Sequence, residues 1–342
     1  MADITTLGQI GGVDVQSAAL SGPRGLRMKL LTYGARLTEL WVRDSSGALA
    51  DIVLGHDNLE DWQSLGGYLG ATCGRYSNRI AEGRFPMDGR SVQLAQNEGA
   101  QHLHGGAAGF DSRHWQIASH SATHVTFATT SAAGEMGYPG TLHASATYRI
   151  NGAGLMIEMV ATTDAPTVVN LVNHAYFNLA GQGAGNVLAQ KLRVEADFYL
   201  PVDDRLIPTG EVRLVKDTEF DFRKLRPIGM PMPGPDGFDH NLCLSGPLAA
   251  NGLRPCLEAV DPLSGRRLRL ATSEPGVQLY TGAHFDGTPG KEDAQYPRFA
   301  GFAIETQRFP DSPNRPHFPS ARLEPGQTYR HGMQFDFSPA EL

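Results

Sequence analysis

Apolar and polar residues alternate along much of the chain with the two-residue period of a β-strand. The alternation is clearest in residues 124–129, 147–150 and 155–160. The tetrapeptide Asn-Gly-Ala-Gly at residues 151–154 separates the last two segments and predicts a hairpin turn between them. Further strands are expected where similar segments follow turn-forming Pro-Gly or Ser-Gly pairs, at residues 268–272, 277–281 and 328–337.

Helical periodicity is weak by comparison. The best candidate is a helix of one or two turns at residues 58–62, with Asp57 or Asn58 as its N-cap. Many short strands joined by short turns favour an all-β fold, either a sandwich or a barrel, over an α/β fold. The chain has no repeat of fixed period and no low-complexity linker, so we expect a single domain over residues 1–342.

The composition agrees with a turn-rich β protein, since the 342 residues include 40 glycines and 22 prolines. A net charge of −7, with both signs interspersed, argues against nucleic acid or an anionic membrane surface as a partner. The three cysteines match neither a disulfide framework nor a zinc site. No signal peptide is recognisable, and no apolar run approaches about 18 residues, so we expect a soluble, cytoplasmic protein.

Two titratable residues stand at the ends of apolar segments. His174 follows the apolar residues 168–172, and Glu305 follows the apolar residues 302–304. A histidine and a carboxylate are enough to move a proton between two oxygen atoms. However, a lone histidine is more often a satisfied core residue, and a glutamate here can also lie on the polar face of an edge strand. The pattern alone does not bring the two side chains together.

A second histidine-containing segment raises the question of a metal site. His102 and His104 would point to one face of a strand, as metal ligands often do, but no third ligand follows at a suitable spacing. We therefore expect no metal. Gly105 and Gly106 instead suggest a close approach of the backbone to a bound molecule.

Other polar residues are suited to binding hydroxyl groups. Asn78 and Arg79 offer hydrogen-bond donors, and Asp239 can accept two hydrogen bonds. Each has a structural alternative, namely an arginine that closes a loop or an aspartate that forms a turn.

The sequence lacks the phosphate-loop, dinucleotide-binding and nucleophile-elbow motifs, which argues against nucleotide cofactors and serine-hydrolase chemistry.

Taken in order, these segments resemble the signature segments of the aldose 1-epimerases, the family that includes the galactose mutarotases. The resemblance runs from about residue 31 to residue 337, nearly the whole chain. Any one segment would be weak support, whereas six or more in register are strong. The matching segments are residues 70–80 (GATCGRYSNRI), 103–106 (LHGG), 173–179 (NHAYFNL), 201–203 with 207–210, 238–241 (FDHN) and 276–280 (GVQLY).

The resemblance implies a large antiparallel β-sandwich of the galactose mutarotase-like supersandwich type, with few short helices, an open sugar cleft and no metal or organic cofactor. It also implies that His174 is the general acid and Glu305 the general base. Ala175, where threonine would be expected, is a small departure beside the histidine. The remaining implied site residues bind the sugar: Asn78, Arg79, His104, Tyr176, Asp239 and Gln278.

The implied reaction interconverts the α and β anomers of a free aldose such as galactose or glucose. The C1 hydroxyl loses a proton and the ring oxygen O5 gains one, so the ring opens to the aldehyde and closes again on the other face. Both groups must work near neutral pH. We therefore expect a glutamate with a raised pKa and a histidine with a pKa near its ordinary value of about 6.5.

Two alternative functions remain. A non-catalytic carbohydrate-binding β-sandwich would need no acid–base pair. A hexose-6-phosphate 1-epimerase would need a basic cluster for the phosphate. The sequence shows no obvious cluster of this kind, although Arg75, Arg79 and Arg315 could contribute to one. The expected partner is a small aldose, and the expected state is a monomer or a homodimer.

Overall fold

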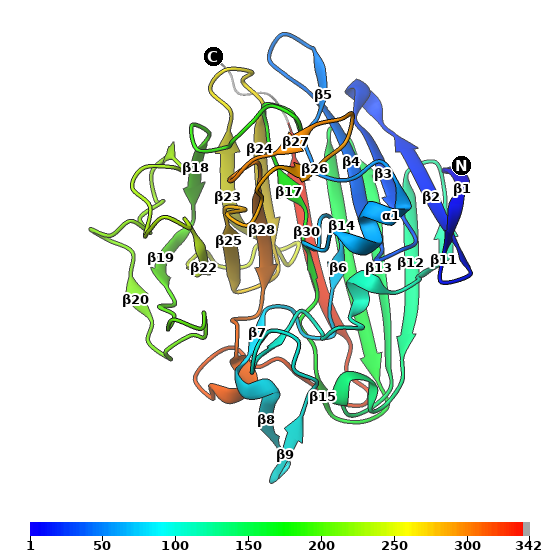
Figure 1. Cartoon of the computed structure of the whole chain (residues 1–342). Coiled ribbons are helices and arrows are strands. Elements are labelled where there is room, and N and C mark those ends of the chain that lie inside the picture. The colour runs from blue at the N-terminus through cyan, green and yellow to red at the C-terminus, as the bar shows by residue number, and fades with distance from the viewer. Residues whose placement is uncertain (338–342) are drawn as a thin grey trace.

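The structure, a computed structural model, describes residues 1–337 and is built mainly from antiparallel strands in three large sheets (Figure 1). The nine-stranded sheet has the order β11 (Gln116–His120), β12 (His124–Ser131), β13 (Leu142–Asn151), β14 (Gly154–Thr163), β30 (Tyr329–Asp336), β24 (Arg267–Thr272), β23 (Arg254–Val260), β18 (Lys191–Val194) and β21 (Arg226–Pro227). The six-stranded sheet has the order β17 (Tyr176–Phe177), β28 (Phe302–Gln307), β25 (Gly276–Tyr280), β22 (Asp239–Leu244), β19 (Ala196–Tyr199) and β20 (Arg213–Leu214). The five-stranded sheet runs from β1 (Asp3–Ile10) through β2 (Val13–Ser21), β3 (Arg27–Leu31) and β4 (Arg36–Arg43) to β5 (Leu49–Asp51).

Smaller elements complete the described chain. Five two-stranded sheets pair β6 (Thr72–Cys73) with β16 (Val172–Asn173), β7 (Arg79–Ile80) with β10 (His102–Leu103), β8 (Arg84–Met87) with β9 (Arg90–Gln93), β15 (Thr167–Val168) with β29 (Arg322–Leu323), and β26 (Thr288–Pro289) with β27 (Gln295–Tyr296). Short 3-10 turns occur at Pro23–Gly25, Ala81–Gly83, Phe110–Ser112, Glu135–Gly137 and Ser312–Asn314. The α-helix α1 (Leu59–Ser64) has six residues. Among residues 1–337, no helix is long and apolar enough to cross a membrane.

Apolar side chains of the three large sheets meet in one continuous core. Phe127 of β12, Leu30 of β3 and Val277 of β25 all belong to it and are almost completely buried. Strands β2 to β4 lie in front of β12 and β13 in Figure 1, as expected when the inner faces of two layers pack together. The predicted all-β sandwich is therefore confirmed.

The predicted strands and turns are also confirmed. Asn151 of β13 pairs with Gly154 of β14, and Gly152 has a φ of 61°, so a tight turn joins the two strands. Helix α1 begins after Asn58, whose side chain accepts a hydrogen bond from the backbone N–H of Asp61. Alternation predicted these elements well because one face of each strand packs on the core.

A buried ion pair fixes the segment between β26 and β27 to the five-stranded sheet. The ammonium group of Lys291 bonds to the carboxylate of Asp51 and donates to the carbonyls of Thr38 and Val53, at 2.7 and 2.8 Å. Lys291 and Asp51 are 5% and 7% exposed, so the attraction between their charges must offset the cost of removing both from water. The neighbouring Leu54 bonds to the carbonyl of Tyr176 and so ties this region to the strand that carries the candidate site.

Candidate active site

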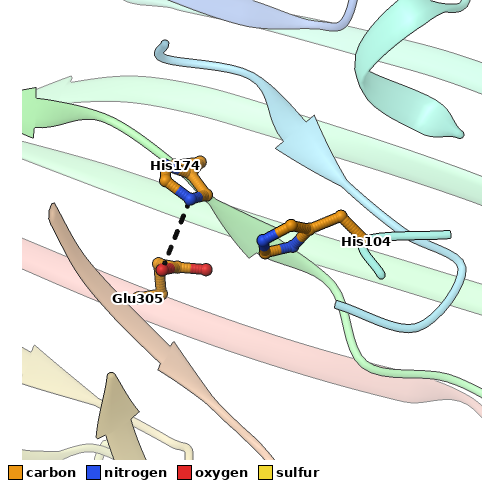
Figure 2. A group of neighbouring side chains, drawn as sticks. All are labelled: His104, His174 and Glu305. Atoms are coloured by element: carbon orange, nitrogen blue, oxygen red, sulfur yellow. Dashed lines mark ion pairs between the residues drawn. The ribbon is translucent and has the colours of Figure 1, made fainter. Parts of the chain in front are cut away.

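His174 and Glu305 meet although they come from distant parts of the chain (Figure 2). His174 follows β16, and its backbone pairs with the segment before β6, donating to the carbonyl of Ala71 at 2.8 Å and accepting from Gly70 at 2.9 Å. Glu305 lies in β28, which is buried at every residue and runs between β17 and β25. The Nε2 atom of His174 is 3.5 Å from the Oε1 atom of Glu305. The alternative position of Glu305, on the polar face of an edge strand, is therefore wrong.

These two side chains stand at the buried end of a cavity of about 970 Å³. A cavity of this size is typical of sites for small molecules. Gln278 alone among the eight predicted site residues does not line it. The other seven do: Asn78, Arg79, His104, His174, Tyr176, Asp239 and Glu305.

Burial moves the pKa values of the pair in opposite directions. Loss of solvent, together with the nearby negative charge of Asp239, raises the pKa of Glu305 to about 8. Loss of solvent lowers the pKa of His174 to about 4. The expected histidine pKa near 6.5 is therefore wrong, because a 3% exposed imidazole cannot readily carry a positive charge. At pH 7 the contact between these side chains joins two neutral groups.

Arg79 is held between two carboxylates. Its Nε and second terminal nitrogen donate to Glu98 at 2.6 and 2.7 Å, and its other terminal nitrogen lies 3.5 Å from Asp239. The planar guanidinium group binds a carboxylate with two parallel hydrogen bonds, which fixes its orientation. The neighbouring Asn78 accepts a hydrogen bond from the backbone of Arg79 through its own side chain, at 2.8 Å. The cavity therefore contains one well-oriented cationic donor.

Gln278 acts on Asp239 rather than facing the cavity. Its Nε2 group donates to the Oδ1 atom of Asp239 at 2.6 Å, and its Oε1 atom accepts from Gln307 at 3.3 Å. Gln278 and Glu305 are direct partners across β25 and β28, so this amide network lies beside the acid–base pair. The network fixes the orientation of the Asp239 carboxylate at the wall of the cavity.

His104 and His102 point to different surroundings. His104 has a φ of 51°, which turns the chain at the end of β10 and separates the two imidazoles. His102 bonds to the carbonyl of Ala95 and the hydroxyl of Tyr138, both at 2.6 Å. Packing within the fold is enough to explain Gly105, because a Cβ atom there would collide with the carbonyl of Gly74. The expected approach of the backbone to a bound molecule stays a prediction.

Three side chains of metal-binding type nevertheless converge here. One ligand atom from each of His104, His174 and Glu305 lies within 4.8 Å of the others (Figure 2). The Nδ1 atom of His104 accepts a hydrogen bond from the backbone N–H of Asn78 at 3.2 Å. The proton of the neutral ring is then on Nε2, which leaves no lone pair for a metal on the cavity side. This tautomer suits donation to a hydroxyl oxygen instead.

Several residues of the cavity region were not predicted from the sequence, and three of them are polar or aromatic neighbours of the predicted site. Tyr68 and His284 line the cavity, and Glu98 orients Arg79 from behind. Tyr68 lies two residues before the first signature segment, in a run of glycines, and an aromatic residue in such a loop was the available signal. We find no comparable signal for Glu98 or His284, because neither lies in a recognisable motif.

The cavity does not carry a basic cluster. Arg75 is 2% exposed and donates five hydrogen bonds to Ser131, Ala132, Pro139 and Gly140, so it has a structural role. Arg315 bonds to Asp311 and to the carbonyl of Pro208 and lies outside the cavity lining. Arg79 and Arg213 are the lining arginines among the described residues, against five aspartates and glutamates besides the neutral Glu305: Asp203, Asp204, Glu219, Asp236 and Asp239.

Comparison with known proteins shows the family of the chain. The family model described as Aldose 1-epimerase matches residues 16–336. The chain belongs to the aldose 1-epimerase family. The galactose mutarotases of Bos taurus and Homo sapiens are 44% and 43% identical to it, each over 92% of this chain and 92% of the relative. The aldose 1-epimerase of Escherichia coli K12 is 35% identical with the same coverage. The resemblance inferred from the signature segments is confirmed.

Solved structures of aldose 1-epimerases share the fold. The GalM/aldose epimerase homologue from C. elegans superposes with a TM-score of 0.88 at 32% identity and covers 94% of this chain and 98% of its own. The galactose 1-epimerase from Lactobacillus acidophilus has a TM-score of 0.85 at 26% identity and covers 100% and 99%. The predicted supersandwich is therefore confirmed, and the family identifies the chain as an isomerase that acts on carbohydrates.

Proposed function

We propose that this aldose 1-epimerase interconverts the α and β anomers of a free aldose such as galactose or glucose, with His174 and Glu305 as the proton-transfer pair. The observation that carries the proposal is the 3.5 Å contact between these two side chains at the buried end of the cavity. An acid and a base that act on neighbouring oxygens can each accelerate ring opening by about 10²- to 10⁴-fold.

The reaction needs one proton removed and one delivered. The carboxylate of Glu305 takes the proton of the C1 hydroxyl while His174 donates a proton to O5. The C1–O5 bond breaks, its electrons remain on O5, and the C1 oxygen becomes the aldehyde oxygen. Rotation about the C1–C2 bond presents the other face of the aldehyde, and the reverse transfers close the ring.

The pair has the required single proton at neutral pH. With a pKa of about 8 for Glu305 and about 4 for His174, that proton is on the carboxyl group before a sugar binds. Moving it to the imidazole produces the carboxylate and the imidazolium that ring opening uses. A bound sugar supplies hydroxyl groups that stabilise the charged form, so substrate binding favours this transfer.

The remaining cavity residues suit a neutral, hydroxyl-rich ligand. Arg79, Asn78 and the Nε2 group of His104 would donate to sugar oxygens, whereas Asp239 would accept from sugar hydroxyls. Tyr176, 2% exposed and 5.0 Å from His174 between ring centres, would form part of the wall behind the acid. Gln278 would contribute indirectly, through the orientation of Asp239. The excess of carboxylates disfavours the phosphorylated sugar of a hexose-6-phosphate 1-epimerase.

Polarimetry on freshly dissolved α-anomers of galactose and glucose tests the proposal. The wild type should accelerate anomer equilibration, and both His174→Ala and Glu305→Ala should reduce the acceleration by at least 10²-fold while remaining folded. His143→Ala is the matched control, because His143 is exposed on β13 and lies outside this cavity. Full activity in either site variant would contradict the assigned roles. An inactive wild type that still binds sugar would instead favour a carbohydrate-binding protein.

We also propose that the chain acts as one domain, without a metal or organic cofactor, as a cytoplasmic monomer or homodimer. The core shared by the three large sheets supports the single domain. Light scattering after size-exclusion chromatography distinguishes the two oligomeric states, and activity retained after chelation tests the absence of a metal.

A further inference from the structure

His331 joins the two segments that carry the proton-transfer pair, although it lies outside the cavity lining. The residue belongs to β30 in the nine-stranded sheet and is 0% exposed. Its imidazole bonds to Thr306 of β28, in the six-stranded sheet, and to Leu171, which precedes β16. A buried polar side chain depends on such hydrogen bonds, because it has lost its contact with water.

Both ring nitrogens of His331 are engaged. Nδ1 is 2.9 Å from the carbonyl oxygen of Leu171, which can only accept, so Nδ1 carries the proton. Burial lowers the pKa of His331 to about 4, so the ring is neutral at pH 7 and Nε2 is an acceptor. Nε2 then accepts from the hydroxyl group of Thr306 at 2.7 Å, and the Thr272 hydroxyl is farther away at 3.4 Å. The ring therefore bridges two groups in one fixed tautomer.

The bond to Thr306 holds the strand of the base. Thr306 directly follows Glu305 in β28, and successive side chains of a strand point to opposite faces. Glu305 lines the cavity, whereas Thr306 is 0% exposed and does not line it. His331 therefore contacts β28 from the face behind the base, at the residue next to it.

The segment that carries the acid is held from the same strand. Leu171 stands three residues before His174, and its backbone N–H donates to the hydroxyl group of Tyr329 at 3.1 Å. Tyr329 and His331 are two residues apart in β30, so they share a face. The two residues between Leu171 and His174 form β16, which pairs with β6, so the backbone there is extended and held in place. A shift of Leu171 would therefore reach His174.

We propose that His331 is a positioning residue that holds the acid and the base at the separation that proton transfer requires. It acts through its bridge between Leu171 and Thr306 and not by contact with the sugar. The inference rests on the proposed function, which assigns the acid and the base. Proton transfer depends steeply on the distance between the reacting atoms, and a misplacement of about 1 Å can lower the rate about 10²-fold.

His331→Phe removes both ring nitrogens and keeps an aromatic ring in the core. This variant should lower kcat for galactose at least about tenfold, because the acid and the base lose their common anchor. KM should change less than about twofold, because Arg79 and Asp239 are oriented by other side chains. Polarimetry over a range of galactose concentrations separates the two constants.

Thr306→Val tests one arm of the bridge with almost no change of shape, since a methyl group replaces the hydroxyl. It should lower kcat at least about threefold and leave KM within about twofold of the wild type. When it is combined with His331→Phe, kcat should be no lower than in His331→Phe alone, because the bond is already lost. If His331→Phe does not fold, Thr306→Val decides the test.

Tyr296→Phe is the matched control, because it also removes a buried hydrogen-bonding group. Tyr296 is 1% exposed, and its hydroxyl group bonds to Gly55 and Gln182, which lie outside the cavity lining. This variant should keep both kinetic constants. An unchanged kcat in either folded bridge variant, or an equal fall in Tyr296→Phe, would overturn the inference, and so would a change confined to KM. An inactive wild type would overturn the proposed function together with the inference, whereas an active enzyme that is insensitive to the bridge overturns the inference alone.

Discussion

Glu305→Gln should reduce activity and stabilise the fold at the same time. The side chain is 2% exposed, and burial raises its pKa from 4.5 to about 8. The folded protein therefore binds this proton more tightly than the unfolded chain does. The resulting stabilisation is complete below pH 4.5 and is lost as the pH rises through about 8. A glutamine has nearly the same shape and carries no charge at any pH, so it removes this dependence.

The size of the effect follows from the pKa difference. Each pKa unit corresponds to about 1.4 kcal/mol, so the ionisable carboxyl costs the folded wild type about 3 kcal/mol at pH 7. Between pH 5 and pH 8 the unfolding free energy of Glu305→Gln, relative to the wild type, should therefore rise by about 3 kcal/mol. Loss of the proton acceptor should lower the rate of anomer interconversion by about 10²- to 10⁴-fold.

Urea unfolding at pH 5 and pH 8, together with polarimetry, measures both effects. Glu274→Gln is the matched control, because Glu274 is 1% exposed and burial raises its pKa to about 7, but it lies outside the cavity lining. This control should gain stability with the same sign and keep its activity. A pH-independent stability difference, or a less stable Glu305→Gln at pH 8, would refute the argument that burial holds a proton on Glu305.

Further measurements test other parts of the structure. The pH profile of kcat/KM should be bell-shaped, with limbs near pH 4 and pH 8, because His174 and Glu305 together need one proton. At low pH a second proton blocks the base, and at high pH no proton is left for the acid. A flat profile from pH 3 to pH 10 would contradict this. Glu98→Gln should raise KM several-fold with little change in kcat, because Arg79 loses its charged bidentate partner; an unchanged KM would argue against that orienting role. Lys291→Met should lower the unfolding free energy by about 3–5 kcal/mol, because it leaves a buried carboxylate without its counter-charge. A loss below about 1 kcal/mol in urea unfolding would show that the carboxylate becomes neutral instead.

Local patterns in the sequence were enough to predict the strands and the family. In β13 and β14 alternate residues are buried, as the two-residue period of residues 147–150 and 155–160 required. The cap at Asn58 and the turn at Gly152 depend on neighbouring residues alone, so they too were predictable. The resemblance to the family implied His174 and Glu305 as a pair, because the signature segments keep their order along nearly the whole chain.

Only the tertiary structure decided how the paired residues behave. The register between β25 and β28 and the pairing of the segment before β6 bring Glu305 and His174 to 3.5 Å, and long-range contacts of this kind have no local signal. The opposite pKa directions arise because both side chains are removed from solvent, which depends on every element packed around them. Tertiary packing also sets two further contacts of the site. Glu98 bonds to Arg79, and Tyr68 packs against two histidines, because the packed sheets fix the conformation of the loops that carry these residues.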